Sequence, residues 1–235
     1  MNEKVLWKIE ELWKKYYQSR DKTTIDVSKN YENGVSKYYS PFHKVDNFHF
    51  HQSPEPVFTD DYGEYLGLER YQVLEKDNTL VYLFDNHNEM LYPLVEIFTA
   101  TKHQYDIVHI DAHPDDAKFQ AEKIQTLNLE NVPDYIKKTR ISDFFDAISE
   151  TNIIQDIHLV THSDSLEFFL PPKQPYILSL DIDIFGPEGD FAELKDKVRS
   201  IALAWGNADA VCIATSPGFI DQEYAQKIIE IFTKS

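Results

Sequence analysis

The chain has 235 residues, an ordinary apolar content of 42% and one cysteine, which together indicate a globular protein and exclude an internal disulfide or a cysteine-based zinc site. Its net charge of −17 argues against binding to nucleic acid, whose phosphates it would repel, and permits a cationic partner. Residues 1–20 lack the apolar core of a signal peptide and no stretch is long enough to span a membrane, so we expect a cytoplasmic protein with no membrane partner.

The first 76 residues are interpreted as an N-terminal elaboration, part helical and part irregular. Apolar residues recur at helical spacing over residues 3–20 and predict an amphipathic helix. Residues 21–60 are rich in turn formers, which predicts irregular structure with a short strand at Asn47–His51. We expect residues 1–76 to pack on a core formed by residues 77–235, within a single domain.

From residue 77 onward, apolar runs alternate with amphipathic segments. The runs predicted to be strands are Thr79–Phe84, Tyr105–Ile110, Ile154–Thr161, Tyr176–Leu180 and Asp209–Ala214. The segments predicted to be helices are Glu89–Thr99, Ile136–Ser149, Phe191–Ala204 and Asp221–Phe232, the last with Asp221 as its N-cap. Strands that alternate with helices predict an α/β fold with a doubly wound, mostly parallel sheet.

Polar clusters directly follow three of these predicted strands. They begin at Asp85, Asp111 and Asp181, and ligands of open parallel sheets bind outside the carboxyl ends of the strands. Within D-x-H-x-D and D-x-D, alternate side chains point the same way while the chain stays extended. Carboxylates with imidazoles suit Mn²⁺ or Fe²⁺ and, less well, Zn²⁺. The predicted metal ligands are His87, Asp111, His113, Asp115, Asp181 and Asp183. Their four carboxylates would offset the charge of two divalent ions.

These clusters carry a resemblance to a known family. VHIDAHPD (108–115) and LSLDIDIF (178–185) resemble the two signature segments of the arginase and ureohydrolase superfamily, whose fold the histone deacetylases share. FDNHNE (84–89) resembles the loop that carries the first histidine ligand. The chain is most similar to the peptide arginases of ribosomal-peptide natural-product pathways, which hydrolyse arginine side chains in a precursor peptide to ornithine and urea. The resemblance covers roughly residues 77–232 and implies a trimmed ureohydrolase-type fold.

The resemblance also implies two Mn²⁺ per chain. Asp111 and Asp181 would bridge the ions. The remaining ligands would divide into His87 and Asp115 for one ion and His113 and Asp183 for the other. A hydroxide between the ions would be the nucleophile, since a bound metal lowers the pKa of water. We therefore expect a manganese-dependent ureohydrolase whose partner is an arginine-containing peptide. A homo-oligomer is compatible with these features.

Two departures from the arginase pattern concern the substrate. Free-arginine enzymes carry a glutamate after a late strand, but the stretch Ile213–Pro217 has no acidic residue. The candidate substrate-binding residues are therefore Glu89, Asp221 and Glu223. The family's proton-shuttle histidine is also missing from its usual place, and His162, at the end of a predicted strand, is the candidate catalytic residue.

Three other interpretations remain open. A deacetylase on the same fold would typically keep one zinc and lose some of the six ligands, all of which are present here. A phosphotransferase of the haloacid-dehalogenase type would use Asp181 and Asp183 of LDIDIF, but the chain that follows is too short for the rest of that fold. A metal-stabilised binding module would bind ions without turnover.

Overall fold

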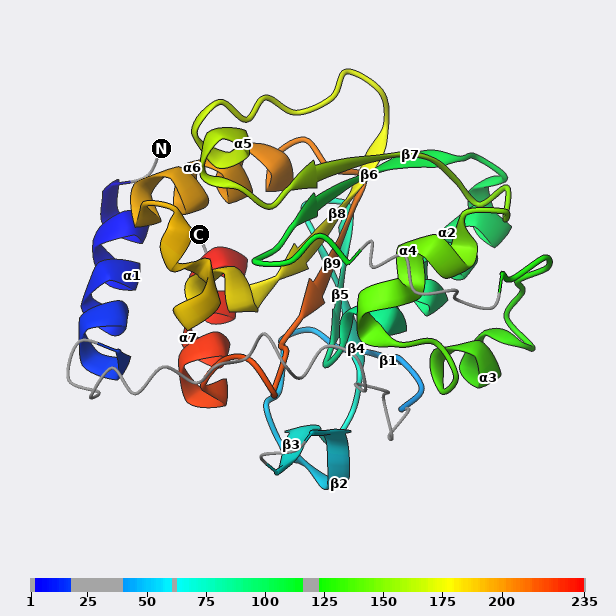
Figure 1. Ribbon diagram of the computed structural model, residues 1–235, viewed down its shortest axis with the longest axis horizontal. Helices are drawn as coiled ribbons and strands as arrows, with labels where there is room; N and C mark the ends of the chain where they lie inside the picture. Colours follow the sequence, from blue (N-terminus) through cyan, green and yellow to red (C-terminus); the bar gives the residue numbers. More distant parts are fainter. Residues whose placement is uncertain (1–2, 18–39, 61–62, 116–122, 235) are drawn as a thin grey trace.

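A seven-stranded sheet lies between layers of helices in the computed structural model of the protein (Figure 1). The structure describes residues 3–17, 40–60, 63–115 and 123–234. In spatial order the strands are β1 (His43–Lys44), β4 (Gln72–Lys76), β5 (Thr79–Phe84), β9 (Ala210–Ala214), β8 (Tyr176–Asp181), β6 (Tyr105–Ile110) and β7 (Ile154–Val160). The last five strands in this order, β5, β9, β8, β6 and β7, are parallel to one another, whereas β4 runs antiparallel to β5.

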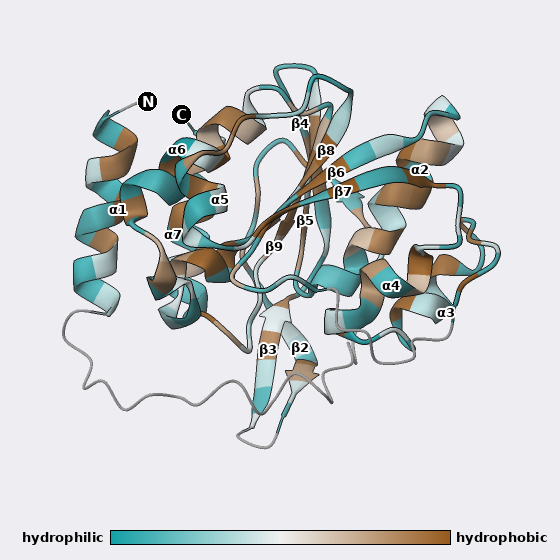
Figure 2. Ribbon diagram, turned by 45° about the horizontal axis from the view of Figure 1, so that its top comes forward, coloured by the Kyte–Doolittle hydropathy of each residue, from teal (hydrophilic) through white to brown (hydrophobic). Residues whose placement is uncertain are grey.

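Helices cover both faces of this sheet (Figure 1). One side carries α1 (Glu3–Tyr16), α5 (Ser163–Glu167), α6 (Leu194–Trp205) and α7 (Gln222–Thr233), and the other carries α2 (Leu91–Thr101), α3 (Val132–Ile136) and α4 (Phe144–Ile148). Figure 2 shows hydrophobic residues concentrated along the central strands, as expected for strands that are buried on both faces. The predicted α/β class with a mostly parallel sheet is confirmed, and the arrangement is compatible with a doubly wound fold.

The predicted core elements agree closely with the structure. The five predicted strands correspond to β5, β6, β7, β8 and β9, with bounds that differ by at most one residue. Helices α2, α6 and α7 correspond to three of the predicted helices. Asp221 caps α7 as predicted, because its Oδ1 accepts the backbone N–H of Tyr224 at 3.1 Å. Within the described ranges, none of the helices combines the length and apolar character that crossing a membrane requires.

The segment before residue 77 supplies strands to the sheet as well as packing on it, so the prediction that residues 21–60 are irregular is wrong for His43–Lys44 and Gln52–Thr59. Strands β1 and β4 belong to the main sheet, and β2 (Gln52–Thr59) and β3 (Glu64–Leu68) form a separate antiparallel pair. Helix α1 lies against α6 and α7, where the rings of Tyr16 and Tyr17 have centroids 5.4 and 5.2 Å from that of Tyr224. Residues 18–20 of the predicted first helix, and residues 21–39 of the segment predicted to be irregular, lie outside the described residues.

The strand predicted at Asn47–His51 is wrong. The side chain of Gln72 takes the place of a neighbouring strand: its Oε1 accepts the backbone N–H of His49 at 2.8 Å, and its Nε2 donates to the His49 carbonyl at 2.6 Å. Since a side chain satisfies both backbone groups of His49, that residue needs no strand partner.

The single helix predicted over Ile136–Ser149 is also wrong. The chain there ends α3, forms a short 3₁₀ turn, η4 (Ile141–Asp143), and then forms α4. The buried Nδ2 of Asn88 donates to the carbonyls of Ile136 and Thr139 at 2.8 and 2.9 Å. These tertiary hydrogen bonds use carbonyls that a continuous helix would have bonded internally, so helical periodicity is overridden here.

Candidate metal centre

Four parallel strands end at the same level of the sheet. Phe84 of β5 and Asp181 of β8 both pair with Ala214 of β9, and Leu180 of β8 pairs with Ile110 of β6. The side chains that follow these strands come from distant parts of the sequence and meet at one edge, where ligands of open α/β sheets bind. The three polar clusters of the sequence therefore converge.

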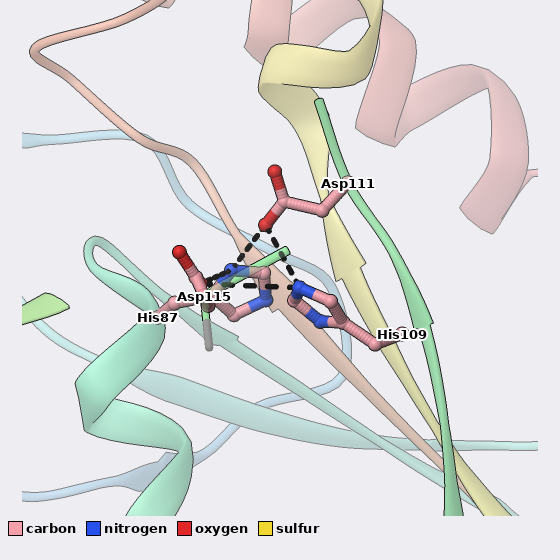
Figure 3. A group of neighbouring side chains, drawn as sticks. All are labelled: His87, His109, Asp111 and Asp115. Atoms are coloured by element: carbon pink, nitrogen blue, oxygen red, sulfur yellow. Dashed lines mark ion pairs between the residues drawn. The ribbon is translucent and has the colours of Figure 1, made fainter. Parts of the chain in front are cut away.

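His87 lies at the centre of the first group of side chains, which also contains His109, Asp111 and Asp115 (Figure 3). Its Nδ1 is 2.8 Å from Asp111 Oδ2 and 3.1 Å from Asp115 Oδ2. The same nitrogen is 3.3 Å from Asp181 Oδ2. All four side chains are buried. One imidazole nitrogen thus faces three carboxylate oxygens, an arrangement that a cation can occupy.

A second group lies beside the first and shares Asp111 with it. His113 Nδ1 is 3.0 Å from Asp183 Oδ2 and 3.4 Å from Asp111 Oδ1. The two oxygens of Asp111 therefore face different groups: Oδ2 faces His87 and Oδ1 faces His113. The structure brings together all six of the predicted ligand side chains.

The first aspartate of each signature segment also shapes its own loop. Asp111 Oδ1 accepts the backbone N–H of His113 at 2.7 Å, and Asp181 Oδ1 accepts the backbone N–H of Asp183 at 2.8 Å. In each case a side chain bonds the backbone two residues ahead, which folds the chain into a tight turn. The alternate ligands are thus aligned by turns beyond the strand ends, and not by the extended chain that the sequence suggested.

The electrostatics of the buried groups favour a cation. Burial and the neighbouring Asp183 and Asp181 raise the pKa of Asp111 well above its usual range, and burial with Asp181 raises the pKa of Asp183 to about 6. Among the residues that the structure describes, no well-aligned hydrogen-bond partner reaches the buried atoms His87 Nδ1 and Asp115 Oδ2, which is costly unless another group satisfies them. These buried histidines and aspartates could hold metal ions.

Two residues at the site have strained backbone conformations. Asp115 has a φ of 46° and Ser216 a φ of 47°, in the left-handed region that side-chain-bearing residues rarely adopt. Ser216 follows β9 and its Oγ donates to Asp181 Oδ2 at 2.5 Å. Strained backbone of this kind clusters at functional sites. Here Asp115 belongs to the first group, and Ser216 bonds Asp181, which faces His87.

The loop that carries His87 is anchored to the antiparallel pair β2 and β3 and to the residue that follows β9. The carboxylate of Asp85 accepts the backbone N–H of Leu68 at 3.0 Å and the hydroxyl of Thr215 at 2.9 Å. Asn86 Nδ2 donates to the carbonyl of Val57 at 3.2 Å. Asp85 and Asn86 are buried, so these polar side chains fix the position of the 3₁₀ turn η3 (His87–Met90) at the start of α2.

Glu89 stabilises this loop instead of facing an open site. It is fully buried. Its Oε2 accepts the backbone N–H groups of Asp85 and Asn86, both at 2.9 Å, and its Oε1 accepts the Tyr71 hydroxyl at 2.5 Å. Both carboxylate oxygens are bonded to the protein, so the geometry does not support the expectation that Glu89 binds substrate.

Replacing Glu89 with glutamine is expected to lower the free energy of unfolding by about 1–3 kcal/mol, because a buried hydrogen-bond acceptor becomes a mismatched amide. Urea denaturation of the metal-free protein would measure this loss. The bound metal and the Michaelis constant for substrate should change little in comparison. A variant of normal stability with a large increase in Michaelis constant would instead restore Glu89 as a substrate contact.

The other two predicted substrate carboxylates are used in the packing of α7. Asp221 caps the helix through Tyr224, as described above. Glu223 is exposed and pairs with Lys227 one turn along the same helix. Neither residue contacts the groups around His87 and His113, so the geometry does not support a role for them in binding substrate.

His162 is exposed at the end of β7, the edge strand of the sheet. Its backbone N–H donates to Ser165 Oγ at 3.0 Å and its carbonyl accepts from the Leu166 N–H at 3.0 Å. The structure places it at the carboxyl ends of the strands, as predicted, but not in contact with the predicted metal ligands. Its role as a proton shuttle stays a prediction.

Sequence reasoning missed two ionisable side chains that contact the predicted ligands. His109 is buried within β6, with its Nδ1 3.1 Å from Ser179 Oγ, and its Nε2 lies 3.3 Å from Asp111 Oδ2 (Figure 3). Its position two residues before Asp111 on a strand could have revealed this, because such residues share a face. Glu188, from the turn η6 (Pro187–Phe191), contacts His113 Nε2. No sequence pattern singled it out.

The groups are closed on one side and partly open on the other. Phe144 and Phe145 of α4 cover the rings of His87 and His109, with centroid distances of 5.7 and 4.9 Å. By contrast, the His113 side chain is 16% exposed, and the half-buried ring of Phe219 lies 5.7 Å from it. Within the described residues, the second group is therefore more accessible to solvent than the first.

Comparison with models of known protein families found no match, and comparison with curated protein sequences found none. The resemblance to ureohydrolases therefore depends on the three short segments quoted above. The capacity to hold metal ions does not depend on it, because the donors and their geometry belong to this chain.

Proposed function

We propose that this protein is a binuclear manganese hydrolase that converts arginine side chains within a peptide to ornithine and urea. The observation that carries the proposal is the position of Asp111, whose two carboxylate oxygens face two adjacent groups of potential ligands. A carboxylate shared in this way can hold two divalent ions close together. The resemblance of the three segments to peptide arginases supports the choice of substrate.

The reaction adds water across one bond of the guanidinium group. A carbon–oxygen bond forms at Cζ, the Cζ–Nε bond breaks, and the departing Nε takes a proton to become the amine of ornithine. Guanidinium is resonance-stabilised and permanently charged, so its carbon is a poor electrophile. Manganese bound here would supply activated water, because divalent ions lower the pKa of water toward neutrality.

The residues of this chain divide the remaining tasks. His87 and Asp115 would hold one ion, His113 and Asp183 the other, and Asp111 both. Asp181 faces His87 and is held by Ser216, which fixes its orientation. The two phenylalanines of α4 exclude water from the buried side, which strengthens electrostatic interactions within the site.

A peptide is the expected substrate for two reasons. The stretch Ile213–Pro217 lacks the glutamate that free-arginine enzymes of the resembled family carry there, and its Ser216 instead donates to the predicted metal ligand Asp181. The net charge of −17 would attract a basic peptide, and this attraction should weaken as salt is raised.

The test is to incubate manganese-loaded protein with an arginine-containing peptide and, separately, with free arginine. We expect the peptide to lose CH₂N₂ per arginine by mass spectrometry, with release of urea, and free arginine to react far more slowly. The Asp183→Asn protein is the matched negative control. Turnover of free arginine without turnover of the peptide would contradict the proposed substrate. Loss of acetyl from an acetyl-lysine peptide would assign the protein to the deacetylases.

A further inference from the structure

A buried hydroxyl connects the two histidines of the first group. Ser179 Oγ lies 3.0 Å from His87 Nε2 and 3.1 Å from His109 Nδ1, and all three side chains are fully buried. Ser179 on β8 is the register partner of His109 on β6. Each of these two residues precedes a predicted ligand by two positions, so both point to the same face of the sheet as that ligand.

Metal binding by His87 would determine to which neighbour the Ser179 hydroxyl donates its hydrogen. The Nδ1 of His87 faces the carboxylates, so a neutral ring that binds through Nδ1 carries its hydrogen on Nε2. That nitrogen then donates to Ser179 Oγ. The hydrogen of the Ser179 hydroxyl then needs a separate acceptor. Within the described part of the chain, the only other group bonded to Ser179 Oγ is His109 Nδ1.

The hydrogen bond from Ser179 in turn determines which nitrogen of His109 carries hydrogen. Because Nδ1 accepts from Ser179, the hydrogen of a neutral ring is on Nε2. That nitrogen lies 3.3 Å from both Asp111 Oδ2 and the backbone carbonyl of His113. A nitrogen that carries hydrogen cannot bind a metal ion, but it can donate to either of these oxygens.

We infer that His109 is a positioning residue, which donates from Nε2 to Asp111 and the His113 carbonyl, and that Ser179 fixes it in this tautomer. His109 would otherwise count as a ligand, since it lies within the first group. The inference rests on the metal centre proposed above, but not on the substrate. A donor on Asp111 Oδ2 would hold the shared carboxylate in the orientation that serves both groups.

The first test measures metal binding by variants of His109, with calorimetry for affinity and elemental analysis for the number of ions. We expect His109→Ala to bind as many Mn²⁺ ions per chain as the parent when saturated, with about 10–100-fold weaker affinity, as is typical when a partner of a ligand is removed. His109→Gln should recover part of the affinity, because its amide can donate in place of Nε2. A variant that is folded but holds one ion fewer than the parent would overturn the inference, because His109 would then be a ligand.

The second test uses ¹⁵N-labelled histidine in the full chain loaded with diamagnetic Zn²⁺. We expect the NMR signals of His109 to show hydrogen on Nε2 and an accepted hydrogen bond at Nδ1. Hydrogen on Nδ1 with Nε2 bound to the metal would overturn the inference. Neither result depends on hydrolysis, so a protein that binds ions without processing arginine would contradict the proposed function and leave this inference intact.

Ser179→Ala keeps both imidazole rings and removes only the hydroxyl between them. It should weaken Mn²⁺ binding and keep the parent number of ions. Ser200→Ala is its matched control: Ser200 is equally buried and donates to the Leu166 carbonyl at 2.6 Å, on α6 away from the site. If Ser200→Ala weakened metal binding as much as Ser179→Ala, the effect would be one of general stability and the role of Ser179 would be rejected.

Discussion

Replacing Asp111 with asparagine is expected to remove metal binding and hydrolysis together. Asp111 faces both groups of ligands, so its loss should disturb both ions, whereas Asp183→Asn changes the second group alone. A catalytic metal contributes several kcal/mol to transition-state stabilisation, which corresponds to a loss of about 10³-fold or more in rate. Elemental analysis and the peptide assay would measure the two losses in the same preparation.

Asp106→Asn is the matched control for this experiment. Asp106 is a buried carboxylate on the same strand, β6, but at its opposite end, where its Oδ2 lies 2.8 Å from His158 Nε2. It should keep the parent number of ions and the parent activity, even if the protein becomes less stable. An Asp111→Asn protein with full metal content and full activity would refute the proposed centre.

Manganese is expected to stabilise the protein, and more strongly at pH 8 than at pH 5.5. In the metal-free fold, burial and Asp181 raise the pKa of Asp183 to about 6. Such a group contributes stability that is complete below its unfolded pKa and is lost as the pH rises through 6. Although burial lowers the pKa of His113, Asp183 and Glu188 raise it to about 11, and the sign of its contribution is the same. Metal must displace these protons, so its apparent affinity increases with pH.

The size of this effect follows from mass action. At a free Mn²⁺ concentration of a hundred times the dissociation constant, the stabilisation is about 2.7 kcal/mol, or roughly 5–10 °C in melting temperature for a chain of this size. Thermal unfolding with Mn²⁺ and with a chelator, repeated from pH 5.5 to 8, would measure it. Equal melting temperatures at every pH would contradict a structural role for the ions, and Asp111→Asn should abolish the difference.

The main strands could be predicted because their sequences contain a single type of signal. Runs such as TLVYLF and YILSL are apolar throughout and end at polar residues, as expected for parallel strands covered on both faces. The wrong strand at Asn47–His51 and the wrong helix over Ile136–Ser149 have a common physical cause. Gln72 bonds backbone groups within Asn47–His51, and Asn88 bonds backbone groups within Ile136–Ser149. Both side chains are remote in sequence from the segments they bond. A local pattern cannot reveal a hydrogen bond from a remote side chain.

The meeting of the six predicted side chains could be expected because they lie in clusters at the ends of strands, whereas their supporting residues carry no such signal. Asn86 and Glu89 are of residue types that are common in ligand-binding loops. Only the structure shows that they instead fix the loop that carries His87. His109 and Ser179 lie inside apolar strands, and their contact depends on β6 and β8 being neighbours. The sequence predicted both strands but not their order in the sheet.

The order of the sheet has a consequence for biosynthesis. Among the described strands β9 is the last in the chain, yet it lies in the middle of the sheet and joins β5 to β8. Without β9, nothing in this strand order joins β1-β4-β5 to β8-β6-β7, and each half would expose an unpaired inner edge of the kind that promotes aggregation. His87 follows the first half and Asp111 the second. The centre can therefore form only after the halves have joined, and a metal ion held by both residues would then connect them.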